Sequence, residues 1–187
     1  MIHPLKLKPY CVLECNDLEV ISKKVHTYVT TSVDVSTSTR PWTPVDVIPL
    51  IKAVPELIAW FNTLGLKIRD AAITYIDSDI PHLASLPLHI DQLPVIAKIN
   101  IPIFNTDGYL NRWFSITDSY YHSLMSGNND DPIDKSQCEF LGEVDMKNPI
   151  VLNSAIPHEV VNTGTGKNPR IVLSCIFFNE PIHYLEP

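Results

Sequence analysis

Short apolar segments rich in Val, Ile and Thr fill the second half of the chain, and clusters of turn-forming residues separate them. Such segments predict strands, because β-branched side chains favour extended backbone while Gly, Asn, Asp and Pro favour turns. Short strands at this density predict a mainly β fold, a sandwich or jelly roll, over a helical bundle. The expected strands cover residues 71–76, 95–104, 112–117, 138–144, 149–153, 159–162 and 170–178, with turns at 105–108, 127–132 and 163–169.

The first 66 residues carry a different pattern, which predicts helical segments packed on one sheet. Leu18–Val29 predicts a short helix capped by Asn16 or Asp17. Thr30–Thr39 is rich in Ser and Thr and predicts a loop. Val45–Leu64 has apolar residues at intervals of three and four, which predicts an amphipathic helix.

Pro49 or Pro55 is expected to interrupt that second helix, and Gly65 is expected to end it. With 187 residues the chain is long enough for one domain with a sizeable core, and no internal repeat divides it. We therefore expect a single domain over residues 1–187, in which residues 1–66 support a β core of residues 67–180.

The composition counts against several classes of protein. Hydrophobic residues make up 45% of the chain and charged residues 19%, as in ordinary soluble domains. The formal net charge is −7, and no basic cluster exceeds Lys23–Lys24, which counts against binding to duplex nucleic acid. No apolar run approaches the roughly 18–20 residues of a membrane span. Met1–Tyr10 lacks the apolar core of a signal peptide, so we expect a cytoplasmic protein.

The four cysteines lack the spacing of a zinc site and are expected to be reduced thiols. The oligomeric state stays open, because no sequence pattern bears on it.

One histidine and one aspartate stand two residues apart in a candidate strand. In Leu88–Gln92 these are His89 and Asp91, and side chains at positions i and i+2 of a strand point to the same face. Two histidines and one carboxylate form the facial triad that holds Fe(II) and leaves coordination positions open. His158, at the start of an expected strand and before a Gly- and Asn-rich turn, is the candidate for the third ligand.

Arg170 opens an apolar segment twelve residues after His158. If its side chain points inward, the guanidinium needs an anionic partner, because a buried unpaired charge is costly. The distal carboxylate of a diacid meets that need in bidentate geometry.

The His-x-Asp pair, the later histidine and the arginine, in this order, resemble the pattern of Fe(II)/2-oxoglutarate-dependent oxygenases. The likeness runs from about Ala72 to Phe178. Residues 97–103, 105–108 and 157–162 look like small single-domain members from bacteria and their viruses, which are distantly similar to aspartyl/asparaginyl and prolyl hydroxylases. The resemblance implies a double-stranded β-helix, a cupin-like jelly roll with a few N-terminal helices on one sheet. A viral origin would place the protein in the host cytoplasm.

The resemblance also assigns roles to individual residues. It implies that His89, Asp91 and His158 bind the iron and form the catalytic centre. It implies that Arg170 binds the C5 carboxylate of 2-oxoglutarate, and that Asn100 points from mid-strand towards this co-substrate.

One position departs from the family pattern. Many relatives carry Ser or Thr two residues after the arginine, where this chain has Val172. Ser174 lies on the same face of a regular strand, one repeat further along, and is the candidate replacement. Tyr75 is a candidate for an additional hydroxyl.

The implied activity is that of an Fe(II)- and 2-oxoglutarate-dependent dioxygenase, expected to hydroxylate an amino-acid or peptide side chain. The substrate would then be a small molecule, a peptide or a protein. The segments Asp77–Leu86 and Ser119–Gln137 are candidates for loops that cover the metal face.

Two alternatives stay open at this point. One is a cupin-like metal enzyme that takes no 2-oxoglutarate, and the other is a jelly-roll binding or structural protein without catalysis. The 2-oxoglutarate-dependent function requires an arginine for the far end of the diacid, whereas the cupin-like enzyme does not. The binding or structural protein requires no metal, whereas both enzymes do.

Overall fold

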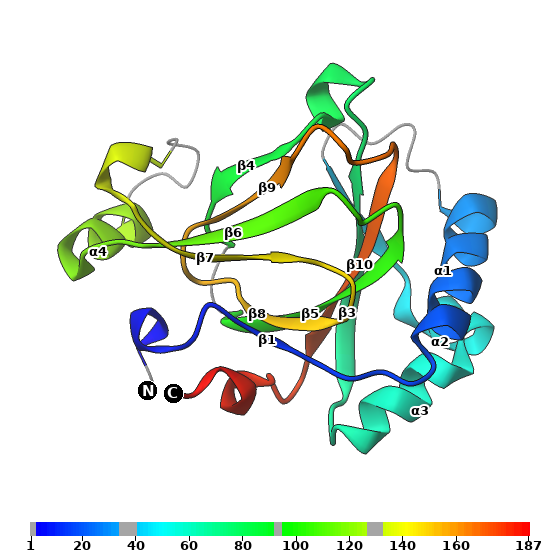
Figure 1. The fold of residues 1–187 in the computed structure, drawn as a ribbon. Coiled ribbons are helices and arrows are strands. Elements are labelled where there is room, and N and C mark those ends of the chain that lie inside the picture. The colour runs from blue at the N-terminus through cyan, green and yellow to red at the C-terminus, as the bar shows by residue number, and fades with distance from the viewer. Residues whose placement is uncertain (1–2, 34–40, 92–94, 127–132) are drawn as a thin grey trace.

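Two antiparallel sheets face each other at the centre of the molecule (Figure 1). The structure is a computed structural model that describes residues 3–33, 41–91, 95–126 and 133–187. The large sheet has the strand order β1-β8-β5-β10-β3-β2, and the small sheet has the order β4-β9-β6-β7. The strands are β1 (Tyr10–Val12), β2 (Trp42–Val45), β3 (Ile68–Ile76), β4 (Leu86–His89), β5 (Ala97–Phe104), β6 (Tyr109–Ser115), β7 (Glu139–Asp145), β8 (Ile150–Asn153), β9 (His158–Asn162) and β10 (Arg170–Phe177).

From β3 onward the chain passes back and forth between the two sheets. β3, β5, β8 and β10 lie in the large sheet, whereas β4, β6, β7 and β9 lie in the small one. Neighbouring strands pair in antiparallel register throughout both sheets. This is the strand arrangement of a double-stranded β-helix, so the mainly β jelly roll predicted from the sequence is confirmed.

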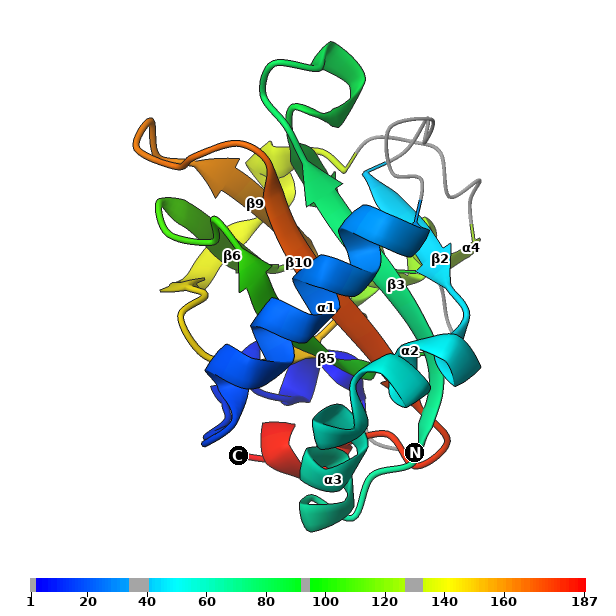
Figure 2. The same cartoon turned by 90° about the vertical axis from the view of Figure 1, so that its right-hand side faces the viewer.

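Three helices cover the outer face of the large sheet (Figure 2). Buried side chains such as Ile21, Leu50 and Phe61 pack with the central strands in one apolar cluster. None of the helices in the described segments is long and apolar enough to cross a membrane. The helices are α1 (Leu18–Ser32), α2 (Val47–Ala53), α3 (Pro55–Thr63) and α4 (Asp118–Ser126), with short 3-10 helices at Pro4–Lys6, Pro81–Leu83, Lys135–Gln137 and Ile182–Leu185.

β10 separates the core under the helices from the interior between the sheets. Its residues at odd positions 171–177 belong to the apolar cluster beneath the helices. Val172, on the opposite face, packs with Trp113 of β6 in the small sheet. Arg170, on the same face as Val172, contacts Asn111 of β6. Alternation along this strand therefore places an apolar row on one side and, on the other, a mixed row that includes the polar Arg170 and Ser174.

Most of the predicted strands form, with ends that differ by a few residues. β10 begins at Arg170 and β8 ends at Asn153, as expected. β6 begins at Tyr109, three residues before the predicted start. The short strands β1 and β2 were not predicted, and both lie at the edges of the large sheet. The N-terminal third thus supplies strands as well as helices.

Helices form in both segments where they were predicted, but their ends differ from the prediction. α1 runs on to Ser32, so the first three residues of the loop expected at Thr30–Thr39 are helical, and residues 34–40 lie outside the described residues. The expected helix over Val45–Leu64 is two helices, because Val45 belongs to β2 and the chain breaks at Val54. Pro55 opens α3, where its missing N–H has no helical partner to lose.

The segment Ser119–Gln137 is not the plain loop that the sequence indicated. Most of α4 lies in it, and a short 3-10 helix ends it. Residues 127–132, an expected turn, lie outside the described residues. Gly65 ends the helical region as predicted, because it adopts a φ of 68° that residues with a side chain rarely take.

The contact between Phe61 of α3 and Phe177 of β10 gives a test of this packing. The two buried rings meet edge to face with centroids 4.9 Å apart. We expect Phe177→Ala to lower the free energy of unfolding by about 3–5 kcal/mol in urea denaturation, because it leaves a cavity under the helices. The adjacent Phe178 is 67% exposed, so Phe178→Ala should cost less than about 1 kcal/mol. Equal losses in both variants would contradict the assignment of the two faces.

Candidate metal centre

Two imidazoles meet where β4 pairs with β9. His89 and His158 are direct partners in the antiparallel register, and their ring centroids lie 4.3 Å apart. The Nδ1 atom of His89 lies 2.7 Å from the carbonyl oxygen of Pro87, and the Nδ1 atom of His158 lies 2.9 Å from that of Ile156. These backbone contacts orient both rings with Nε2 towards Asp91, which is the arrangement that metal-binding histidines commonly show.

Asp91 completes the group from just beyond the end of β4. Its backbone N–H donates to the carbonyl of Ser154 at 2.9 Å, which fixes the segment after His89. One Asp91 oxygen lies 3.6 Å from Nε2 of His89, and the other lies 3.9 Å from Nε2 of His158. The candidate ligand atoms of all three residues lie within 4.8 Å of one another. The predicted strand Leu88–Gln92 was wrong in extent, since β4 ends at His89, and Gln92 lies outside the described residues.

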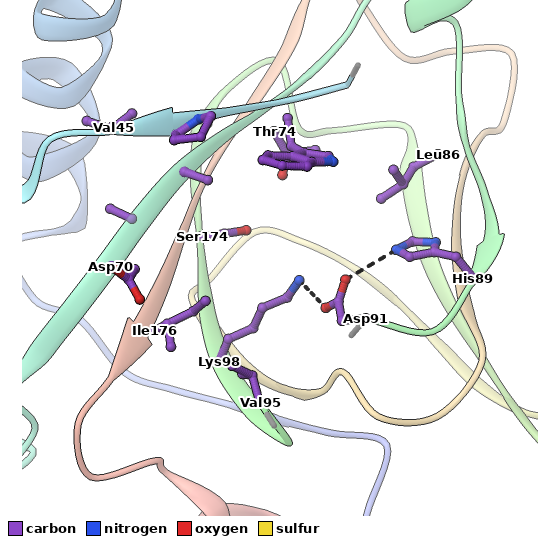
Figure 3. Close-up of a pocket in the computed structure, with 14 residues that line it drawn as sticks. Val45, Asp70, Thr74, Leu86, His89, Asp91, Val95, Lys98, Ser174 and Ile176 are labelled. Carbon is purple, nitrogen blue, oxygen red and sulfur yellow. Dashed lines mark hydrogen bonds and ion pairs between the residues drawn. The ribbon is translucent and has the colours of Figure 1, made fainter. Parts of the chain in front are cut away.

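Lys98 of β5 is the cation next to this group. Its Nζ forms a short ion pair with Asp91 (Figure 3). Burial alone raises the pKa of the Asp91 carboxyl, but Lys98 and the two imidazoles outweigh burial and hold the pKa far below its ordinary value. Asp91 is therefore an anion at neutral pH, as a metal ligand must be.

His158 is buried and neutral at physiological pH. Its burial, reinforced by the nearby His89, lowers the pKa of its imidazole to about 3. A neutral imidazole keeps the Nε2 lone pair that a metal needs. Two imidazoles and one carboxylate suit a divalent transition metal with open coordination positions, so the residues present fit a non-heme iron.

A second polar group lies between the sheets, at the start of β10. Arg170 is 1% exposed, and its guanidinium donates to Oδ1 of Asn111 on β6 at 3.4 Å. The ring of Tyr109 lies under the guanidinium, 5.7 Å from its central carbon. Burial lowers the pKa of Arg170 to about 10, so the group remains a cation at neutral pH. No carboxylate is within ion-pairing distance of Arg170 in the described parts of the chain.

Three buried donors in this interior lack an acceptor. They are Nε of Arg170, Nδ2 of Asn111 and Nε1 of Trp113. An unpaired buried donor costs about 1–3 kcal/mol, and more when it is charged. All three are N–H groups, so a ligand that reaches any of them must accept hydrogen bonds, and one that reaches Arg170 should also carry negative charge. A carboxylate has both properties.

The spacing along β6 relates this donor cluster to the triad. Trp113 pairs with His158, and Asn111, two residues away, contacts Arg170. Two strand residues span roughly 7 Å. The two groups therefore lie close along the inner face of the small sheet, and the donors at Arg170 suit one carboxylate of 2-oxoglutarate.

The other predicted co-substrate residues lie elsewhere on the inner face. Ser174 pairs with Asn100, and its hydroxyl donates to the Asn100 amide oxygen at 2.6 Å. Ser174 is four residues from Arg170, about 13 Å along the strand. The structure therefore brings these two together near the triad and not beside Arg170, and their contact with a co-substrate stays a prediction. Val172, at the position where relatives carry a hydroxyl, is fully buried in an apolar cluster.

Tyr75 does not reach the interior between the sheets. It packs against the apolar cluster under the helices, and its hydroxyl lies 3.4 Å from Oδ2 of Asp77. The expectation that it adds a hydroxyl to the co-substrate site was wrong, because Tyr75 stands at an outward position of β3.

A pocket of about 460 Å³ opens beside the triad, between the edge strand β2 of the large sheet and the edge strand β4 of the small one. We call it the edge pocket. Figure 3 shows Lys98 and His89 directed at Asp91 on one side of it, with Leu86 nearby. Arg170, Asn111 and Trp113 do not line it. Two of the three candidate ligands, His89 and Asp91, line the edge pocket, and the donor cluster lies outside its lining. Its wall includes Trp42, Pro44, Leu86, Lys98, Ser174 and Ile176.

Sequence reasoning missed two residues of this interior, Asn111 and Lys98. Asn111 and Trp113 alternate with outward residues of β6, but the predicted strand began at Arg112 and so excluded Asn111. Lys98 was read only as part of an apolar strand. Its signal is a charged residue at an inward position of β5, which requires a partner.

No protein-family model and no curated protein matches the chain. Several solved structures, in contrast, are similar to the chain. AviO1 from Streptomyces viridochromogenes Tue57 superposes with a TM-score of 0.53 at 11% identity, over 96% of this chain and 93% of AviO1. HygX from Streptomyces hygroscopicus, solved with nickel and 2-oxoglutarate bound, gives 0.51 at 13% identity, over 90% of this chain and 81% of HygX.

A third similar structure is SnoN, a non-heme α-ketoglutarate-dependent epimerase from nogalamycin biosynthesis. It gives a TM-score of 0.51 at 12% identity, over 92% of this chain and 78% of SnoN. The resemblance predicted from the sequence is therefore confirmed at the level of the fold. The chain has the fold of AviO1, HygX and SnoN, and its interior holds a His-Asp-His triad.

Proposed function

We propose that the chain is an Fe(II)- and 2-oxoglutarate-dependent dioxygenase. One observation carries the proposal: a triad suited to Fe(II) and a cluster of buried donors without acceptors lie about two strand residues apart. Two imidazoles and a carboxylate suit a divalent metal, and the N–H donors of the second group suit an anion. The likeness of the fold to HygX, which was solved with nickel and 2-oxoglutarate, supports the same pairing of ligands.

The residues have distinct tasks in this proposal. His89, Asp91 and His158 hold the metal, and Arg170 with Asn111 holds the far carboxylate of 2-oxoglutarate. When bound, the iron supplies the reduction of dioxygen coupled to decarboxylation of 2-oxoglutarate, in which one oxygen atom enters succinate and the other enters a substrate C–H bond. The protein contributes geometry, because the backbone contacts of both Nδ1 atoms fix the imidazoles before the metal arrives.

The expected outcome of the reaction is hydroxylation of a carbon, with an amino-acid or peptide side chain as the substrate. The edge pocket is the space for that substrate, since it opens directly at His89 and Asp91. The fold is shared with the epimerase SnoN, so the product has to be identified by experiment. Gain of one oxygen atom indicates hydroxylation, and inverted configuration at unchanged mass indicates epimerisation.

The direct test is turnover of 2-oxoglutarate by protein purified without oxygen and then supplied with Fe(II) and air. We expect iron-dependent formation of succinate, which increases when candidate amino acids or peptides are added. Absence of any iron-dependent succinate would contradict the proposal. Conversion of a substrate without consumption of 2-oxoglutarate would instead support a cupin-like enzyme of another kind, and failure to bind metal would support a binding or structural protein.

Replacement of one histidine tests the metal site. His158→Ala removes one of three ligands, so the dissociation constant for Ni(II), measured by calorimetry, should rise at least about 100-fold. The exposed His183, which stacks on Tyr184, gives a matched control, and His183→Ala should leave the constant unchanged. Equal affinity in the wild type and His158→Ala would exclude His158 as a ligand.

A nearly isosteric change tests the donor cluster. Asn111→Asp introduces a carboxylate that pairs with Arg170 in place of the far carboxylate of 2-oxoglutarate. Affinity for 2-oxoglutarate should therefore fall about ten-fold or more. Affinity for Ni(II) should not change, because residue 111 does not belong to the triad. Asn62→Asp makes the same change on the exposed side of α3 and serves as the control. Unchanged 2-oxoglutarate binding in Asn111→Asp would place the co-substrate elsewhere.

A further inference from the structure

Lys98 lies in an unusual position for a lysine. Its side chain is 16% exposed and projects from β5 into the edge pocket. Among the described residues its ammonium pairs with Asp91 alone. In the proposed function Asp91 binds a dication, which withdraws much of the negative charge that stabilises Lys98. The ammonium then needs another anionic partner within its reach.

The co-substrate does not account for this need. In the proposed function Arg170 and Asn111 supply the donors for the far carboxylate of 2-oxoglutarate, and neither lines the edge pocket. With neutral imidazoles, Asp91 and both carboxylates of 2-oxoglutarate still leave one positive charge among the dication, Lys98 and Arg170. The interior is therefore complementary to one further negative charge.

The remaining carboxylate of the edge pocket does not cancel that charge. Asp70 pairs with Arg69 at 2.7 Å, and its side chain is 60% exposed. In the large sheet Asp70 pairs with Ile176, which also lines the pocket. Asp70 is thus already compensated and stands in solvent, whereas Lys98 is largely enclosed.

We infer that Lys98 binds a carboxylate of the substrate, and that the substrate is a small acid with an apolar body. This inference rests on the proposed function. Val45, Leu86, Val95 and Ile176 give the pocket its apolar surface. Its volume of about 460 Å³ suits a small molecule and lies in the range typical of ligand sites. Lys98 would hold the acid group near the metal and leave the apolar part against these walls.

The experiment uses Ni(II)-loaded protein saturated with 2-oxoglutarate, so that no turnover occurs. Isovalerate and its primary amide, isovaleramide, have the same shape and differ in charge. Calorimetry should show the acid binding about ten-fold more tightly than the amide, the difference expected for a charge-assisted hydrogen bond. In Lys98→Met that preference should vanish, and Lys98→Arg should retain most of it. Lys147→Met removes an exposed lysine and should behave as the wild type.

Several results would overturn the inference. One is equal or absent binding of the two probes by the wild type, and another is an acid preference that survives in Lys98→Met. Loss of 2-oxoglutarate affinity in Lys98→Met, with the probe preference intact, would assign Lys98 to the co-substrate. In all three cases Ni(II) and 2-oxoglutarate still bind the wild type, and the proposed function stands. If neither binds, the proposed function fails together with the inference.

Discussion

A fully buried guanidinium without a carboxylate partner is the constraint on which the interior of this protein depends. Arg170 lies between the two sheets, and the described structure gives it one amide oxygen and one aromatic face. Burial of a charge costs several kcal/mol unless a partner compensates it. The neighbouring N–H groups of Asn111 and Trp113 also lack acceptors. In the proposed function, this interior receives the far carboxylate of 2-oxoglutarate.

The fold also fixes where Arg170 lies relative to the triad. β9 carries His158 next to β4, which carries His89, and β6 lies on the other side of β9. The antiparallel register of β6 with β9 sets the distance of Asn111 from the two imidazoles. Because Arg170 contacts Asn111, the register also sets the position of Arg170 relative to them. The helices on the large sheet bury the opposite face of β10 and so hold the strand in place. The positions of the candidate site residues therefore depend on how the strands pair more than on the loops.

The triad was accessible to sequence analysis because two of its members stand two residues apart and the third precedes a strand. The three residues lie together as expected although β4 ends before Asp91, since the hydrogen bond from Asp91 to Ser154 holds the segment after His89. Asn111 and Lys98 were not accessible in the same way. Their inward orientation depends on where β6 begins and on which face of β5 meets the small sheet. β2 was missed because Thr43-Pro44 resembles the start of a helix. Pairing with β3 instead holds these residues in an extended strand.

The most direct measurement is a crystal structure of the protein with Ni(II) and 2-oxoglutarate. The account predicts a metal bound to Nε2 of His89, a carboxylate oxygen of Asp91 and Nε2 of His158, and a far carboxylate of 2-oxoglutarate that accepts from Nε of Arg170. It also predicts that Lys98 no longer has Asp91 as its main partner. A metal held by other residues, or a 2-oxoglutarate carboxylate distant from Arg170, would contradict it.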